Sequence, residues 1–241
     1  TRSTHASTDA NRANLAKSFL QDVRAKYAGT RLARQELDGV LLDQEEGALW
    51  SHAHFTRSAE VDLNSFDRIV VAVDPPVTHS KSSDECGIVV VGARTQGPAQ
   101  SWRATVLADL SFKPKSPNDW ARRAIAAMQE FHADRLVAEV NQGGDMVKTI
   151  VATLDPLIPF TGVHAARGKA VRAEPVAALY EQGRVTHAPG LHALEDQMCR
   201  MTHQGYRGSG SPDRVDALVW AIFELMLAPA QPIFDPQIRS L

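Results

Sequence analysis

DRIVVAVDPPVTHSKSSDECGIVVVG, residues 67–92, is the stretch that decides the fold of this chain. The run from Arg68 to Val73 is almost continuously apolar and β-branched, which predicts a strand covered on both faces. Two prolines follow Asp74 and cannot donate to a strand ladder, so the strand ends at that carboxylate. A second apolar run, Cys86 to Val91, completes a predicted hairpin with Asp74 at its mouth. A simpler role for Asp74 is a hydrogen bond to the following turn.

The composition is that of a globular protein. The 241 residues are 44% hydrophobic and 22% charged, enough for one large or two small domains. We find no apolar run of about 18 residues and no signal-peptide pattern, and therefore expect an intracellular protein without a membrane span. Cys86 and Cys199 lack the spacing of a zinc knuckle or a disulfide framework. With a net charge of -2, any DNA site must be a local patch or depend on bound metal ions.

The chain up to about residue 60 has a helical pattern. One helix is predicted from candidate caps at residues 7–9 to Gly29, and a second from Arg31 to Leu42, before the GALW motif at 47–50. Two short helices bury little surface on their own, so we interpret this segment as a linker or the trailing edge of an upstream domain.

The second carboxylate of interest also ends a strand. After a third strand at 102–110 and a helix, the apolar run 135–140 predicts a fourth strand that ends around Glu139 and leads through a Gly-Gly turn into another helix. Three meandering strands and a helical crossover predict a mixed α/β sheet with helices on its faces. Ligand sites of open α/β sheets form at strand C-termini, so Asp74 and Glu139 are expected to share one edge. A solvated strand-end acid is the alternative for Glu139.

Three cations follow a fifth predicted strand at 158–164. Arg167, Lys169 and Arg172 are placed in one loop, which can hold the phosphates of a polyanion or can simply be solvated. The glycine spacing here is wrong for a nucleotide loop, which we exclude. A helix predicted at 191–201 would place Cys199 one turn from His203, a spacing that can bind metal or reflect a buried thiol beside a helix-end histidine.

The last predicted helix begins at residues 211–213 and carries two acids. Asp213 and Asp216 are three residues apart and lie on one face near its start, while an apolar face up to Leu225 packs on the sheet. Acids near a helix N-terminus are stabilised by its dipole, which is the simpler explanation for both. Asp216 is less easily explained in this way, because it lies at the rim of a buried face.

Asp74, Glu139 and Asp216 would thus converge from two strands and a helix. Converging carboxylates repel one another, and Mg2+ or Mn2+, which favour all-oxygen ligands, relieve the repulsion. Two such ions can activate a water and stabilise the leaving oxygen in phosphodiester hydrolysis. This arrangement resembles that of the ribonuclease H-like nucleases.

The chain resembles one family in particular, the nuclease domain of the large terminase subunit of tailed bacteriophages and gene transfer agents. The motifs that carry the resemblance occur in the family's order along nearly the whole chain: VAVDPP (71–76), SDECGIVVVG (83–92), AEVNQGGD (138–145), RGKAVRAEPVAALYEQGRV (167–185), LEDQM (194–198) and SPDRVDALVWA (211–221). The resemblance implies a ribonuclease H-like mixed sheet at 61–241, preceded at 1–60 by the trailing part of an absent ATPase domain. No G-x-x-x-x-G-K-[ST] loop occurs, so no ATPase activity is expected of this chain.

The resemblance also implies roles for individual residues. Asp74, Glu139 and Asp216 take the catalytic metal-ligand positions, with Asp74 bridging two Mg2+ or Mn2+ ions, and Asp213 supports them. Asp84 either approaches a metal or a water, or merely caps the hairpin. The candidates for contacts with DNA phosphates are Arg167, Lys169, Arg172 and Arg207.

The implied function is a metal-dependent endonuclease that cuts concatemeric double-stranded DNA with little sequence preference during viral genome packaging. Its implied partners are the portal protein and the small terminase subunit, and its location is the cytoplasm of a bacterial host, with the isolated domain a monomer. A second hypothesis is a portal-docking assembly module with a weak or silent nuclease site. A junction resolvase or transposase-type enzyme would share the acids but explains neither GALW nor LEDQM.

Overall fold

The structure is a computed structural model that describes residues 47–58, 61–76, 85–141 and 144–228. Asp84 and the two helices expected before residue 43 lie outside these ranges. Within them, seven strands form one mixed sheet in the order β1-β7-β4-β3-β2-β5-β6, and β8 and β9 form a separate hairpin. The strands are β1 (Thr56–Arg57), β2 (Arg68–Asp74), β3 (Gly87–Arg94), β4 (Arg103–Asp109), β5 (Arg135–Glu139), β6 (Phe160–Val163), β7 (Val185–His187), β8 (Met201–Thr202) and β9 (Gly205–Tyr206).

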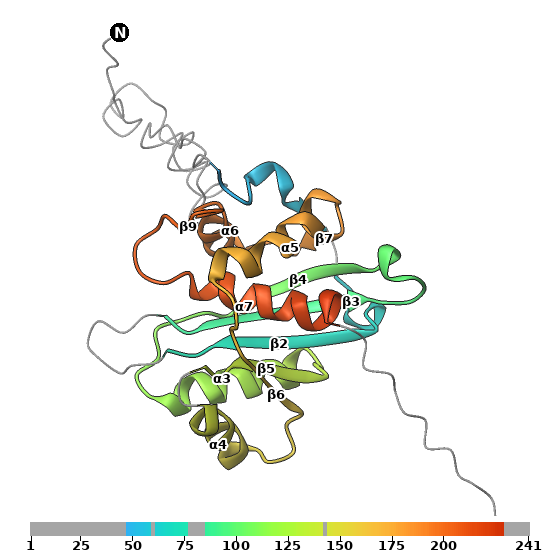
Figure 1. The fold of residues 1–241 in the computed structure, drawn as a ribbon. Coiled ribbons are helices and arrows are strands. Elements are labelled where there is room, and N and C mark those ends of the chain that lie inside the picture. Colours follow the sequence, from blue (N-terminus) through green and yellow to red (C-terminus); the bar gives the residue numbers. More distant parts are fainter. Residues whose placement is uncertain (1–46, 59–60, 77–84, 142–143, 229–241) are drawn as a thin grey trace, which may run out of the picture.

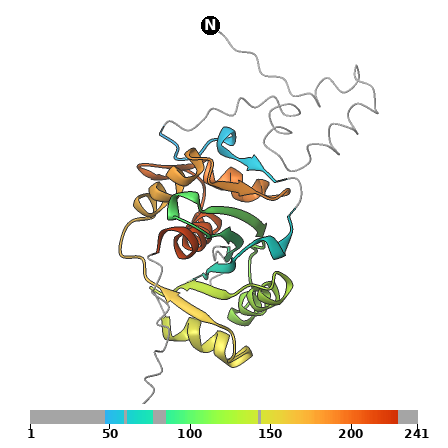
Figure 2. The same ribbon diagram turned by 90° about the vertical axis from the view of Figure 1, so that its right-hand side faces the viewer.

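Helices cover both faces of the sheet, as predicted. One face carries α3 and α4, and the other carries α5, α6 and α7, each face with its own apolar core (Figures 1 and 2). The α-helices in the described ranges are α3 (Pro117–Glu130), α4 (Gly144–Leu154), α5 (Lys169–Glu181), α6 (His192–Met198) and α7 (Asp213–Ile222), which continues as a π-helical turn, Phe223–Leu227. None of these helices is long and apolar enough to cross a lipid bilayer.

Strand β2, the first strand of the stretch 67–92, is buried on both faces. Along β2, Val70 and Ala72 belong to the core under α5–α7, whereas Val71 and Val73 belong to the core under α3 and α4. All four side chains are fully buried, which explains why the run has no polar alternation. β2, β3 and β4 form the predicted antiparallel meander.

The crossover through α3 brings β5 back parallel to β2. Val73 lies opposite Ala138 in this pair, so Asp74 and Glu139 follow side by side at the same edge of the sheet. Because side chains alternate along a strand, both acids point to the face on which Val70 and Val137 lie, the face covered by α7. The shared edge expected from the sequence is confirmed.

Residues 47–58 pack on the body of the domain. Trp50 is fully buried in the core under α5–α7, and β1 pairs in parallel with β7. Leu49 donates its backbone N–H to the carbonyl of Met201 at 2.8 Å, so this segment also binds the β8–β9 hairpin. The domain boundary expected near residue 60 stays a prediction, but the end of that segment contributes to the sheet.

Two elements differ from the sequence prediction. α5 begins at Lys169, so Lys169 and Arg172 lie in and just after its first turn and not in the predicted loop. Pro175 lies inside this helix. The helix predicted at 191–201 is shorter: α6 ends at Met198, and Met201 begins strand β8. His203 lies in the turn of the β8–β9 hairpin, with its imidazole 3.1 Å from the Glu174 carboxylate.

Candidate active site

Four carboxylates gather where β2, β5 and α7 meet. Asp74 and Glu139 come from the strand ends, and Asp213 and Asp216 from the first turn of α7, which packs on β2 and β3. The two α7 acids are buried, with exposed fractions of 6% for Asp213 and 2% for Asp216. We call these four residues the acid cluster. The structure thus brings together the three predicted catalytic acids and the predicted supporting acid.

A glycine allows α7 to approach the sheet. Gly87, the first residue of β3, pairs with Asp74 in the antiparallel ladder. A Cβ at this position would overlap the backbone carbonyl of Asp213 and approach the side chain of Ala217. The glycine of the SDECG motif is therefore required by the close contact between β3 and the helix that carries two of the acids.

The acids are close enough to shift one another's ionisation. Burial, followed by the charges of Asp216, Glu139 and Asp213, raises the pKa of Asp74 well above its usual value. Burial also raises the pKa of Asp216, although Lys169 and Arg172 oppose this shift. No described residue donates a side-chain hydrogen bond to the Asp74 carboxylate. The environment of Asp74 therefore favours a cation as its partner.

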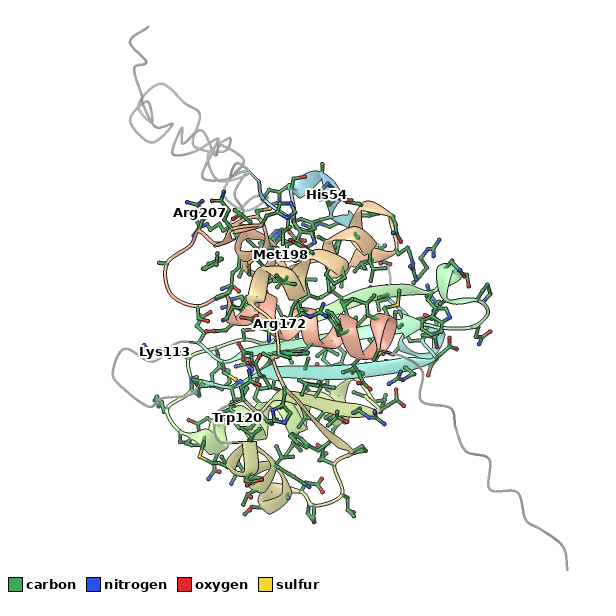
Figure 3. The ribbon with its side chains drawn as sticks, in the orientation of Figure 1. His54, Lys113, Trp120, Arg172, Met198 and Arg207 are labelled. Atoms are coloured by element: carbon green, nitrogen blue, oxygen red, sulfur yellow. The ribbon has the colours of Figure 1, made fainter. Side chains whose placement is uncertain are left out.

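Two cations already lie within the acid cluster. Arg172, labelled in Figure 3, extends Nη1 to Glu139 Oε2 (3.3 Å) and Nη2 to Asp216 Oδ1 (3.1 Å). Its guanidinium lies over the Trp220 ring, 4.7 Å from the centroid. Lys169 places Nζ 2.6 Å from Asp216 Oδ2 and donates a hydrogen bond to Ser211 Oγ at 2.8 Å. In this structure both residues contact carboxylates of the acid cluster. Their contacts with DNA phosphates remain a prediction.

Two further side chains, which residue spacing alone does not indicate, hold Glu139. Trp220 donates its indole N–H to Glu139 Oε2 at 2.8 Å, and Asn141 donates its amide to Oε1 at 3.0 Å. Asn141 is held in turn by the backbone N–H of Ala165, which donates to its Oδ1 at 2.7 Å. Both residues lie inside the quoted motifs, but nothing in their spacing indicates that they converge on Glu139.

The start of α7 is capped from another helix. Its N-cap residue, Pro212, provides no side-chain hydrogen bond. Gln197 of α6 accepts the backbone N–H of Val215 at 3.0 Å and donates to the carbonyl of Ser211 at 3.5 Å. This residue of the LEDQM motif therefore satisfies a backbone donor that the helix start leaves free.

Two hollows open beside the acid cluster. A cavity of about 120 Å³ exposes Asp74 and Glu139 toward α3 and α4, and its wall is formed by Pro75, Pro76, Pro117, Trp120, Asn141, Met146, Val147 and Ile150. A polar groove of about 470 Å³ reaches Asp213 from the side of α6 and β9. The cluster is therefore accessible to a ligand from both sides.

The remaining predicted phosphate contacts lie farther out. Arg207 donates to Gln204 Oε1 at 2.6 Å and lies near β9, away from Arg172 (Figure 3). Arg167 is exposed in the segment between β6 and α5. Asp84 falls outside the described residues, so its two alternatives stand as before.

The donor set suits a divalent ion, but its present arrangement does not enclose one. Four carboxylates supply the hard oxygen ligands that Mg2+ and Mn2+ prefer, and the buried Asp216 Oδ2 accepts no well-oriented hydrogen bond. In the described part of the chain, no group of three or more His, Cys, Asp or Glu is spaced to hold a metal ion. Lys169 and Arg172 lie against the two oxygens of Asp216. The residues fit the ion by chemistry, and a cation must move to admit it.

A second buried polar network ties residues 55–57 to the rest of the domain. Arg57 binds Glu195 through two hydrogen bonds of 2.6 and 2.7 Å, and His187 lies 2.8 Å from Glu195 Oε1. Tyr180 hydrogen-bonds the other nitrogen of His187, and Phe55 stacks on its ring. Burial opposes ionisation of Glu195, but the hydrogen bonds from His187 and Arg57 lower its pKa to about 2. The glutamate of LEDQM is thus a structural residue.

Comparison with known proteins identifies the same architecture. The model of a family described as the terminase RNaseH-like domain matches residues 71–225. The large terminase of a thermophilic bacteriophage is similar in structure, with a TM-score of 0.54 and 10% identity over 90% of this chain and 53% of that one. So is the large terminase nuclease of a second thermophilic phage, G20c. Its cobalt-bound form gives a TM-score of 0.53 and 14% identity over 74% of this chain and 98% of that one.

The magnesium-bound form of the G20c nuclease gives a TM-score of 0.50 and 18% identity, covering 66% of this chain and 82% of that one. No curated protein matches the sequence. At these identities the structures bear on the fold, and they agree with a ribonuclease H-like sheet.

Proposed function

The chain belongs to the terminase RNase H-like domain family, and from this premise we propose that it is a metal-dependent endonuclease. Its substrate is concatemeric double-stranded DNA, which it cuts with little sequence preference during viral genome packaging in the cytoplasm of a bacterial host. The portal protein and the small terminase subunit are its expected partners through the full-length protein.

One observation carries this proposal. Asp74, at the end of a buried strand, is surrounded by Glu139, Asp213 and Asp216, and their charges, together with burial, raise its pKa well above the usual value. A fold gains no stability from four acids in one place, since like charges destabilise one another. Such a cluster is typical of a site that binds divalent cations, and it lies at the strand C-termini, where α/β sheets bind their ligands.

Each side chain of the acid cluster has a role in this proposal. Asp74, Glu139 and Asp216 are the proposed ligands of two Mg2+ or Mn2+ ions, and Asp213 supports them. When bound, such ions activate a water and stabilise the leaving oxygen. Trp220 and Asn141 hold the Glu139 carboxylate in one orientation through its two oxygens. Hydrolysis adds water across one P–O bond, leaving a phosphate monoester and a free hydroxyl.

The geometry of the surroundings supports a polymeric substrate. The cavity beside Asp74 and the groove beside Asp213 open on two sides of the acid cluster, so a DNA backbone can approach the acids from either side. Arg167, Lys169 and Arg207 are the proposed cationic contacts for its backbone, and Arg172, which is 6% exposed, is proposed to act through Glu139 and Asp216. Contacts with phosphate carry no sequence information, which accords with cutting at little sequence preference.

Plasmid cleavage tests the proposal. We expect the 241-residue chain to nick and linearise supercoiled DNA in Mn2+ or Mg2+ and to lose this activity in EDTA. Asp74→Ala should abolish cleavage, whereas Glu181→Ala, which removes an exposed acid at the end of α5, should leave it unchanged. Equal activity of the parent and Asp74→Ala would refute the assignment.

A second candidate function is a portal-docking assembly module with a weak or silent nuclease site. The ion pairs of Lys169 and Arg172 with Asp216 favour it, because they partly neutralise the acid cluster. Tight metal-independent binding to a portal ring, with no cleavage in any divalent metal, would support this function over the first.

A further inference from the structure

The two cations of the acid cluster are held very differently. Arg172 is 6% exposed, contacts both Glu139 and Asp216, and lies over the Trp220 ring. Lys169 is 43% exposed and contacts Asp216 and the hydroxyl of Ser211. The guanidinium is therefore part of the packed core of the site, whereas the ammonium is on a flexible stem at its edge.

Each carboxylate oxygen of Asp216 contacts a cation in this arrangement. Arg172 contacts Oδ1, and the ammonium of Lys169 lies 2.6 Å from Oδ2. A magnesium ion lies about 2.1 Å from a carboxylate oxygen, so an ammonium and a metal cannot share the same lone pair and the same space. A divalent ion that binds Asp216 at a position now taken by Lys169 or Arg172 therefore requires that cation to give way.

We propose that Lys169 is a displaceable counter-ion of Asp216, which competes with the divalent ion for this ligand, while Arg172 stays in place and positions Glu139 and Asp216. The inference rests on the proposed function, because it assumes that Asp216 is a metal ligand. It assigns to Lys169 a role in setting the affinity of the site for metal.

Displacement would couple metal binding to DNA binding. The released ammonium of Lys169 stays beside the cluster, because its stem begins in the first turn of α5. A backbone phosphate is then an anionic partner to which the ammonium can move. DNA therefore favours the state in which Lys169 has left Asp216, and the site without DNA binds metal less well than its four acids alone would allow.

Direct titration of Mn2+ tests the inference without any use of activity. The numbers of Mn2+ ions bound by the 241-residue chain and their dissociation constants are measured by calorimetry and by the EPR signal of free Mn2+. Lys169→Met removes the competitor and should bind Mn2+ roughly threefold more tightly or better, the effect expected for a partly exposed ion pair. Lys169→Arg keeps the charge and should bind close to the parent. Lys148→Met removes an exposed lysine of α4 and should also match the parent.

The outcomes separate this inference from the proposed function. If the parent binds Mn2+ and cleaves DNA but Lys169→Met binds no more tightly, Lys169 is not a competitor and only the inference fails. If Lys148→Met tightens binding as much as Lys169→Met does, the effect is one of net charge and the inference also fails. If Asp74→Ala binds and cleaves as the parent does, the proposed function fails and the inference with it. Thermal unfolding of each variant verifies that it is folded.

Discussion

Gly87 and Asp213 are in such close contact that the structure has no room for a side chain between them: a Cβ on Gly87 would overlap the carbonyl of Asp213. Gly87 pairs with Asp74 across the β2–β3 ladder, so this contact sets the height of α7 above the acid at the strand end. The distance between the acids of the sheet and those of the helix therefore depends on the absence of one methyl group.

Replacement of Gly87 by alanine should push the start of α7 away from the sheet. We expect a loss of about 1–3 kcal/mol in the free energy of unfolding, the cost of overpacking a well-packed site. The rate of DNA cleavage should fall by more than the loss of stability alone explains, because Asp213 and Asp216 move with the helix. Urea unfolding and plasmid cleavage measure the two effects. Gly168→Ala is the matched control, since a Cβ there meets no atom within 4 Å.

Removal of the indole N–H of Trp220 should impair the reaction. Trp220→Phe keeps an aromatic ring but loses the hydrogen bond to Glu139 Oε2. A hydrogen bond to a charged group contributes about 1.5–3 kcal/mol, so we expect cleavage to slow by roughly tenfold or more. Trp102→Phe serves as the control, because that indole donates to the Gly97 carbonyl in an exposed turn. Equal rates for the two variants would contradict a positioning role for Trp220.

The cap that Gln197 provides should matter for the order of α7. Gln197→Ala leaves the backbone N–H of Val215 without its acceptor, which should cost about 1 kcal/mol of stability. Amide hydrogen exchange should show faster opening in the first turn of α7 than in its later turns. Gln129→Ala, an exposed position on α3, should change neither quantity. Unchanged exchange at Val215 would show that the cap is dispensable.

The network around Glu195 should hold β1 on the domain. Glu195→Ala leaves His187 and Arg57 without their carboxylate partner, and we expect a loss of roughly 3 kcal/mol in the free energy of unfolding. Limited proteolysis near residues 58–61 should accelerate at the same time, because β1 loses its anchor. An unchanged cleavage pattern would indicate that the pairing of β1 with β7 is sufficient by itself.

The network of His187 and Glu195 should lose its stabilising effect as the pH is lowered from about neutrality. Burial lowers the pKa of His187 below its ordinary 6.5, so the unfolded chain binds this proton first and stability declines as the pH falls below that value. The pKa of Glu195 is lowered from 4.5 to about 2, and its contribution is lost between these two values. The raised pKa of Asp74 acts in the opposite direction, so the parent must be compared with a variant of the network.

Urea unfolding of the parent and of Glu195→Gln from pH 7 to 3 makes this comparison. The decrease in the free energy of unfolding below pH 4.5 should be smaller in the variant, because the glutamine side chain does not bind a proton in this range. Asp74 is unchanged in both proteins, and its contribution therefore cancels in the difference. Parallel curves for the two proteins would contradict the role assigned to Glu195.

Patterns of neighbouring residues in the sequence are sufficient to locate most of the strands and helices and the carboxylates of the acid cluster. The unbroken apolar run of β2 and the two prolines after it predict a buried strand that ends at Asp74, and the same logic locates Glu139. These predictions succeed because the burial of a strand and its termination are recorded in neighbouring residues. The order of strands and helices then implies that the two acids share an edge, which the parallel pairing of β2 and β5 confirms.

The sequence by itself therefore determined the mixed sheet, the position of each acid at the end or start of an element, and the family. Only the tertiary structure decided that Lys169 and Arg172 bind the acids, that α5 begins early enough to carry them, and that Gln197 caps α7. The partners of Arg172 lie 33 and 44 residues away along the chain. Such contacts depend on how helices pack over the sheet, and residue spacing within one element carries no record of them.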